Sequence, residues 1–115
     1  MAQGEPIRVM VVDDHPMWRD AVARDLTEAG YEVVATPADG AQALRVVGSA
    51  RPDVVVLDLQ LPDMSGVEVT QGLRAAHPGA RVLVLSASGE QLHNRVELVR
   101  YAIEHGLADT DPRAP

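Results

Sequence analysis

The chain has 115 residues, which suits one compact domain of about 100–150 residues. Hydrophobic residues make up 46% and charged residues 23%, so a disordered or collagen-like chain is excluded. Because Cys is absent, disulfides, zinc–thiolate sites and thiol nucleophiles are also excluded, and we expect a reducing, cytoplasmic compartment.

The charge balance and the apolar runs restrict the partners of the chain. Its formal net charge is −7, with ten Arg and no Lys, which argues against a general nucleic-acid surface. No apolar run approaches the ~18 residues of a membrane span, and the first residues lack the layout of a signal peptide. We therefore expect no membrane segment.

The first 85 residues alternate between two kinds of apolar pattern. Short, largely β-branched segments predict four strands, at residues 7–12, 31–35, 53–57 and 81–85. Segments between them place apolar residues at helical spacing and predict three helices, at residues 16–29, 39–47 and 67–76. This alternation predicts an α/β fold with a doubly wound parallel sheet covered by helices on both faces.

The remainder of the chain has a different pattern. Apolar residues at spacings of four, three and four predict one long helix, with the seam Leu92, Val96, Val99 and Ile103. This seam suits either packing against the sheet or pairing with a second helix, and we favour packing. No fifth strand is recognisable, and residues 109–115 are expected to be disordered.

Three carboxylates follow two of the predicted strands. Asp13 and Asp14 come after the first strand, and Asp58 ends the third. Ligands of open α/β sheets bind at the carboxyl ends of the strands, and clustered carboxylates suit Mg²⁺. The alternative is that these acids cap a helix or a turn. His15, a single histidine at a strand-to-helix corner, is interpreted as a packing or capping residue.

Three segments of the sequence resemble the receiver domain of two-component response regulators. They are VMVVDDHPMWRDAV, VVVLDLQLPDMSGVEV and VLVLSAS, and they occur in the family's order. Pro62 and Gly66 stand at the family's offsets from Asp58, while His15 and Pro16 are similar to the LuxR/NarL-type subfamily. The resemblance covers residue 7 to about residue 88 and implies a flavodoxin-like receiver with strand order 2-1-3-4-5.

The resemblance also implies roles for individual residues. Asp58 corresponds to the phosphoacceptor, and Ser86 corresponds to the hydroxyl that bonds a phosphoryl oxygen, although Ser86 also fits ordinary polarity at a strand end. Mg²⁺ is implied as the cofactor, with Asp14 as a direct ligand, Asp13 as a largely water-mediated ligand, and Asp58 and the Gln60 backbone carbonyl completing the protein ligands. A sensor histidine kinase is the implied partner and phosphate donor.

After Ser88 the sequence departs from this family. The family continues with a fourth helix, a fifth strand that carries a Lys, and a fifth helix, whereas this chain has no Lys. The segment QLHNRVELVRYAIEHGL instead resembles the last helix of the LuxR/NarL DNA-binding domain. We predict a truncated receiver at residues 1–88, this helix at 89–108 and a tail at 109–115. An internal deletion would have joined the helix directly to the truncated receiver. The alternative is a divergent fourth helix.

Both alternatives leave the fourth strand at an edge of the sheet, so that edge and the C-terminal helix are the candidate surfaces for a homodimer. We expect a phosphoacceptor module rather than an enzyme. A non-switching interaction or dimerisation module is the alternative. A phosphohydrolase is disfavoured because Gln60 stands where a general acid is needed. DNA binding is not expected for this chain alone, because no recognition helix precedes Leu92.

Overall fold

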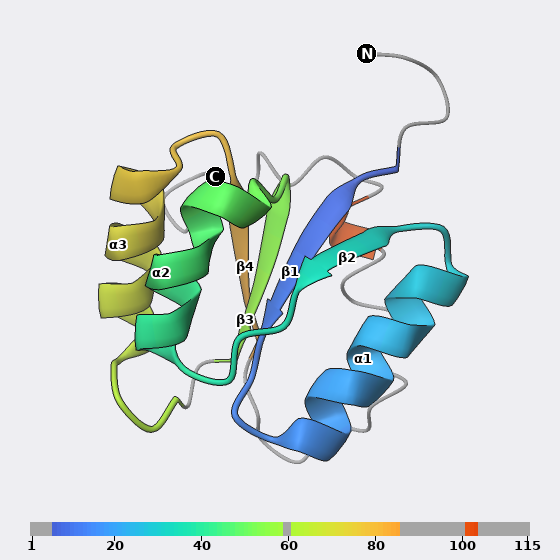
Figure 1. Ribbon diagram of the computed structural model, residues 1–115, viewed down its shortest axis with the longest axis horizontal. Helices are drawn as coiled ribbons and strands as arrows, with labels where there is room; N and C mark the ends of the chain where they lie inside the picture. Colours follow the sequence, from blue (N-terminus) through green and yellow to red (C-terminus); the bar gives the residue numbers. More distant parts are fainter. Residues whose placement is uncertain (1–5, 59–60, 86–100, 104–115) are drawn as a thin grey trace.

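A computed structural model describes residues 6–58, 61–85 and 101–103 of the chain. Four parallel strands form one sheet in the order β2-β1-β3-β4, with α1 on one face and α2 and α3 on the other (Figure 1). The strands are β1 (Arg8–Val12), β2 (Glu32–Ala35), β3 (Val54–Asp58) and β4 (Arg81–Leu85). The helices are α1 (Pro16–Glu28), α2 (Gly40–Ala50) and α3 (Gly66–Ala76). The predicted doubly wound α/β sheet with four strands is confirmed.

The centre of the sheet follows directly from its sequence. All five residues of β3 are buried, as expected for a strand with helices on both sides. Val56 of β3 pairs with Val11 of β1 on one side and with Leu83 of β4 on the other. Within the described ranges, β4 pairs with β3 alone, so it is the edge strand of this part of the chain.

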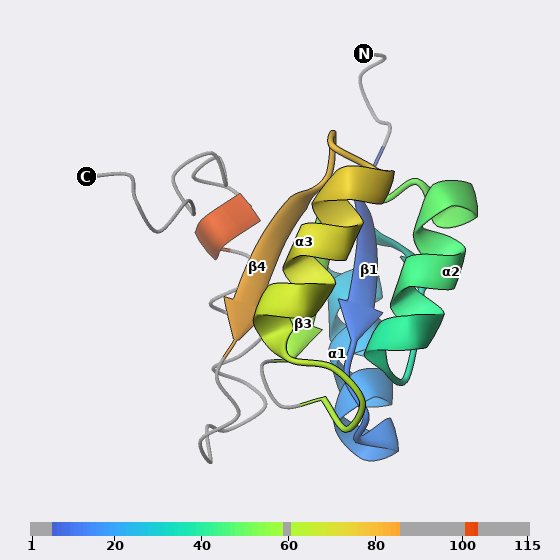
Figure 2. The same ribbon diagram turned by 90° about the vertical axis from the view of Figure 1, so that its left-hand side faces the viewer.

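Two apolar clusters fill the space between the sheet and its helices. One lies under α2 and α3 and includes Met10, Val47 and Leu73. The other lies under α1, and Ala102 and Ile103 pack against it from the C-terminal part of the chain. Figure 2 shows residues 101–103 of this part in red. Ile103 therefore packs on the sheet, as the favoured alternative predicts. The other seam residues lie outside the described residues, as do residues 109–115 and the junction after residue 88.

The helix ends refine the predicted boundaries. The second helix runs to Ala50, three residues beyond the predicted end, and stops because Arg51 adopts a left-handed conformation with φ of 52°. The third begins at Gly66, where Ser65 and Glu68 form a reciprocal capping box. None of the helices among the described residues is both long and apolar enough to cross a membrane.

Candidate metal centre

The carboxyl ends of β1 and β3 bring the three predicted aspartates together. Val12 is paired with Leu57, so the residues that follow on each strand emerge side by side at the same edge of the sheet. The side chains of Asp13 and Asp58 are almost completely buried, with residue exposures of 4% and 2%. Asp14 is half-buried. Three carboxylates therefore share one small, partly dehydrated corner.

His15 also belongs to this corner. Its ring nitrogen Nδ1 lies 2.9 Å from Asp13 Oδ1, 3.0 Å from Asp14 Oδ1 and 3.7 Å from Asp58 Oδ2. One donor atom from each of these four residues lies within 4.8 Å of the others. The hydrogen bond that His15 Nδ1 donates to Asp13 raises the pKa of His15 above its ordinary value. Desolvation opposes this shift, and the charges of Asp14, Asp13 and Asp58 add to it.

The capping interpretation of His15 is wrong for its side chain. His15 occupies the N-cap position of α1, yet its ring makes no hydrogen bond to the helix. The ring turns toward the acids instead, because its nitrogen donates to carboxylate oxygens, whereas the start of a helix presents N–H donors and attracts only acceptors. No sequence pattern signalled this orientation, since the choice of rotamer depends on residues brought together by the fold.

Backbone contacts hold Asp13 in place. Its N–H donates to the Pro37 carbonyl at 3.2 Å, and its own carbonyl accepts from Arg19 Nη1 at 2.9 Å. Its Oδ1 also accepts from the backbone N–H of His15 at 2.9 Å. The end of β1 is thus fixed by α1 and by the segment before α2. No sequence pattern indicated Arg19, because this residue contacts the backbone and not another side chain.

The donor set fits a hard divalent cation. Carboxylate oxygens are the ligands that Mg²⁺ prefers, and the cation would offset the repulsion among three clustered negative charges. Asp14 Oδ1 is buried and accepts no hydrogen bond within the described part of the chain, so a cation would satisfy it. Asp13, Asp14 and Asp58 are the residues that would hold the ion. The two other predicted site residues, Gln60 and Ser86, lie outside the described residues.

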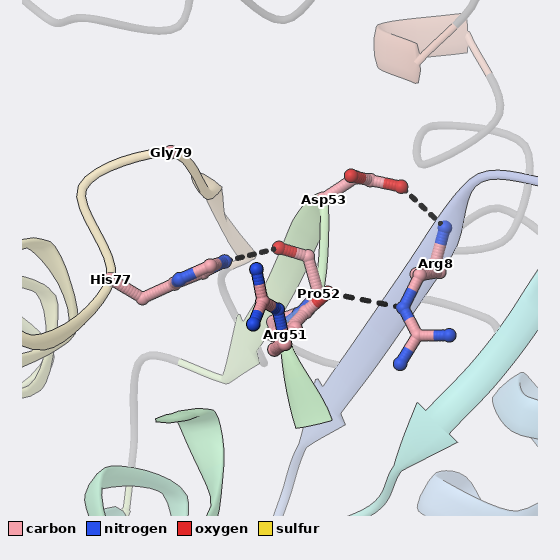
Figure 3. A pocket seen from close by; sticks show the side chains of 6 residues that line it. All are labelled: Arg8, Arg51, Pro52, Asp53, His77 and Gly79. Carbon is pink, nitrogen blue, oxygen red and sulfur yellow. Dashed lines mark hydrogen bonds between the residues drawn. The ribbon is translucent and has the colours of Figure 1, made fainter. Parts of the chain in front are cut away.

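A concave region lies at the opposite end of the sheet, where the strands begin. It has a volume of about 370 Å³, and Figure 3 shows its side chains. The lining residues are Arg8, Arg51, Pro52, Asp53, His77 and Gly79. Its polar groups largely bond to one another: Asp53 accepts from the Arg8 backbone N–H at 2.9 Å, and His77 Nε2 lies 3.1 Å from the Pro52 carbonyl. This arrangement joins the starts of neighbouring strands.

Comparison with known proteins defines the class. The family model for the response regulator receiver domain matches residues 9–109, and the chain belongs to that family. The match extends beyond residue 88, and the predicted domain boundary there stays a prediction. Receiver domains are generally regulatory modules rather than enzymes.

Sequence relatives place the chain near regulators with NarL-type and chemotaxis receivers. The probable transcriptional regulatory protein NarL of Mycobacterium tuberculosis is 38% identical over 107 residues, which cover 92% of this chain and 47% of the relative. The chemotaxis protein CheY of Thermotoga maritima is 32% identical over 102 residues, covering 89% of this chain and 81% of the relative. The first two curated relatives are covered over only 36% and 47% of their own lengths.

Solved structures agree with this assignment. The signal receiver domain of the putative response regulator NarL from Mycobacterium tuberculosis has a TM-score of 0.67 and 37% identity, covering 89% of this chain and 79% of that one. A LuxR-family response regulator from Aurantimonas has a TM-score of 0.68 and 35% identity, covering 89% of this chain and 70% of that one. Receiver domains of the LuxR/NarL type are thus among its structural neighbours.

Proposed function

We propose that this chain is a phosphoacceptor module of a two-component phosphorelay, in which Asp58 receives a phosphoryl group from the phosphohistidine of a sensor histidine kinase. One observation carries the proposal: Asp58 is buried at the end of a central strand, beside Asp13 and Asp14, which follow the neighbouring strand. The membership of the receiver family supports it.

Each site residue has a different role in such a phosphoryl transfer. Asp58 supplies the attacking oxygen, and its fixed position on β3 reduces the entropy cost of reaching an in-line geometry. Asp13 and Asp14, with Asp58 and the Gln60 carbonyl, would hold Mg²⁺. When bound, this ion screens the negative charges that approach one another during phosphoryl transfer. Ser86 would donate a hydrogen bond to the transferred group.

The absence of Lys sets a limit on the proposed switch. The receiver family places a Lys near the phosphoryl group, and this chain contains none. Loss of one electrostatic donor costs roughly 3–4 kcal/mol of transition-state stabilisation in well-studied sites. We therefore propose that acceptance of phosphate is slow and that the response to it is weak. The chain itself would be a regulatory module rather than an enzyme.

Acetyl phosphate with Mg²⁺ provides the test. Intact-protein mass spectrometry should show the addition of one phosphoryl group to the wild-type chain and none to Asp58→Asn. Asp20→Asn, which changes an exposed aspartate of α1, is the matched control and should still be modified. Absence of the added mass with acetyl phosphate and with phosphoramidate, or its persistence in Asp58→Asn, would overturn the proposal.

The second candidate is a non-switching interaction or dimerisation module. The absence of Lys and the edge position of β4 within the described residues favour it. In this role the chain would bind a kinase, or a second copy of itself through the β4 edge or the helix at 89–108, without accepting phosphate. Light scattering after size-exclusion chromatography would detect the dimer, and a gel shift at low salt should show no DNA binding.

The proposed domain organisation is a truncated receiver at 1–88, a helix at 89–108 that resembles the end of a LuxR-type output domain, and a tail at 109–115. Sequencing the surrounding reading frame tests the internal deletion. A neighbouring frame that encodes the missing segment would support it. An uninterrupted gene with no such segment in close relatives would favour a divergent fourth helix instead.

A further inference from the structure

The phosphoacceptor role leaves the orientation of His15 unexplained. Its side chain is 53% exposed, so the ring has room to turn toward solvent, yet Nδ1 approaches three carboxylates. The ring makes no cap to α1. A histidine that served only packing would bury its ring carbons, and His15 is exposed. The ring nitrogen is therefore the part of His15 that the site engages.

The separations among these donor atoms suit one shared ion. With metal–ligand bonds of about 2.1 Å in an octahedral site, neighbouring donors lie about 3.0 Å apart and opposite donors about 4.2 Å apart. The distances of 2.9, 3.0 and 3.7 Å from His15 Nδ1 are close to this range. Since the four donor atoms all lie within 4.8 Å of one another, a small contraction would bring them onto one ion.

A ring nitrogen changes the metal preference of a carboxylate site. Mg²⁺ favours oxygen ligands and keeps several waters, whereas imidazole suits first-row transition ions. The affinity of mixed nitrogen and oxygen sites rises from Mn²⁺ through Co²⁺ to Ni²⁺. A single nitrogen ligand beside three carboxylates would therefore stabilise Co²⁺ much more than Mg²⁺.

We propose that His15 Nδ1 is a fourth protein ligand of the site formed by Asp13, Asp14 and Asp58, and that it gives this site a preference for first-row transition ions over Mg²⁺. The inference rests on the proposed function, because the same three carboxylates hold the ion in both. The inference adds one property to the proposed function: the affinity of the site depends on which divalent ion is available.

Metal titrations with matched variants provide the first test. Dissociation constants for Mg²⁺ and Co²⁺ are measured by calorimetry at pH 8, since a ring nitrogen must lose its proton before it binds a metal. We expect His15→Gln and His15→Ala to weaken Co²⁺ binding by about tenfold or more while changing Mg²⁺ binding by less than about threefold. His77→Ala removes a histidine at the opposite end of the sheet and should change neither constant.

A spectroscopic readout identifies the ligand directly. The chain is loaded with Mn²⁺, and pulsed electron paramagnetic resonance records the coupling between the ion and imidazole nitrogen. Wild type and His77→Ala should show this coupling, and His15→Gln should lose it. Circular dichroism establishes that each variant is folded, which is expected because the His15 side chain is half exposed.

Three results would overturn the inference. The ratio of Co²⁺ to Mg²⁺ affinity could be unchanged in both His15 variants. Nitrogen coupling could be absent from the spectrum of the wild type. His15→Ala could tighten Mg²⁺ binding, which is expected if the ring only occupies the position of the ion and competes with it. In each case, modification of Asp58 in the presence of Mg²⁺ would leave the phosphoacceptor proposal intact. A wild-type chain that binds neither ion would overturn both.

Discussion

The carboxylate of Asp63 accepts a hydrogen bond from the backbone N–H of Gly40 at 2.9 Å, and so caps α2 from a distant part of the chain. Its second oxygen accepts from Ala41, also at 2.9 Å. Asp39 completes the first turn by accepting from the Gln42 N–H at 2.8 Å. Because Asp63 lies in the segment between Asp58 and α3, these bonds also tie the surroundings of Asp58 to α2.

We predict that Asp63→Asn lowers the melting temperature by about 4 °C or more near neutral pH, and that this difference shrinks in acid. The hydrogen bonds from Gly40 and Ala41 hold the pKa of Asp63 below its ordinary value of 3.8. A carboxylate whose pKa is lowered by folding stabilises the fold at pH values above its unfolded-state pKa. This stabilisation is lost as the pH falls through the folded-state pKa.

Thermal melts of wild type and Asp63→Asn across this pH range test the prediction. The difference in melting temperature should be constant above about pH 5. It should narrow below pH 3.8, the ordinary pKa of this carboxyl group. Asp20→Asn, at an exposed position of α1, is the control and should show no comparable difference. A gap between wild type and Asp63→Asn that stays constant throughout the acid range would contradict the assignment.

Two glycines of α2 should respond in opposite directions to alanine. A Cβ at Gly40 would lie 2.8 Å from Val69 Cγ2 and 2.9 Å from Met64 Sδ, and Val69 is buried and stiff. A Cβ at Gly48 would meet nothing within 4 Å. Gly40→Ala should therefore destabilise the fold by about 1–3 kcal/mol through overpacking. Gly48→Ala should stabilise it by about 0.5–1 kcal/mol through helix propensity.

Urea unfolding of both glycine variants beside wild type measures these free energies. The two changes add the same methyl group to the same helix, so their difference isolates the packing of the first turn of α2 against α3. Equal free energies of unfolding for Gly40→Ala and Gly48→Ala would show that Met64 and Val69 move aside without cost.

The sheet and the meeting of the three acids could be predicted because both depend on simple rules. The run of Val and Leu in β3 is buried on both sides in the structure. Parallel strands end at the same edge of a sheet, so Asp58 and the pair Asp13 and Asp14 had to approach one another once β1 and β3 became neighbours. Local pattern and topology were sufficient for this part of the site.

Other features depend on contacts that no local pattern encodes. Asp63 and Gly40 are separated by 23 residues, and only the packing of α3 beside α2 brings them together. The ring of His15 could have turned toward α1 or toward solvent. Its rotamer depends on the three aspartates that the fold brings together beside it. The end of α2 depends on Arg51, whose left-handed conformation is unusual for a residue other than glycine.

The C-terminal part of the chain contributes to the core through Ile103. This side chain packs against the cluster that includes Val9, Val22 and Leu26 beneath α1. Ile103→Ala should lower the free energy of unfolding by about 1–2 kcal/mol, less than for a fully buried isoleucine because Ile103 is half-buried. Urea unfolding measures the change. Val67→Ala, which alters a residue with 65% exposure, is the control and should change stability far less. Equal effects would show that Ile103 contributes no core packing.

Arg8 links β1 to the end of α2, because its Nε and Nη2 donate to the carbonyls of Arg51 and Ala50. These carbonyls lack partners within the helix, so the guanidinium group acts as a C-terminal cap with two donors. We predict that Arg8→Ala lowers the free energy of unfolding by about 1–2 kcal/mol. Arg8→Lys should recover less than half of the loss, because one ammonium group cannot reproduce the fork of the guanidinium.

The ion pair between Arg8 and Glu32 offers the competing explanation. Its atoms are 3.6 Å apart and both side chains are more than one-third exposed, so the pair should contribute less than about 0.5 kcal/mol. Glu32→Gln should therefore be nearly neutral in urea unfolding, and the effect of Arg8→Ala should persist at high salt. A loss in Glu32→Gln that equals the loss in Arg8→Ala, or an Arg8→Ala effect that vanishes in salt, would assign the stabilisation to the ion pair instead of the cap.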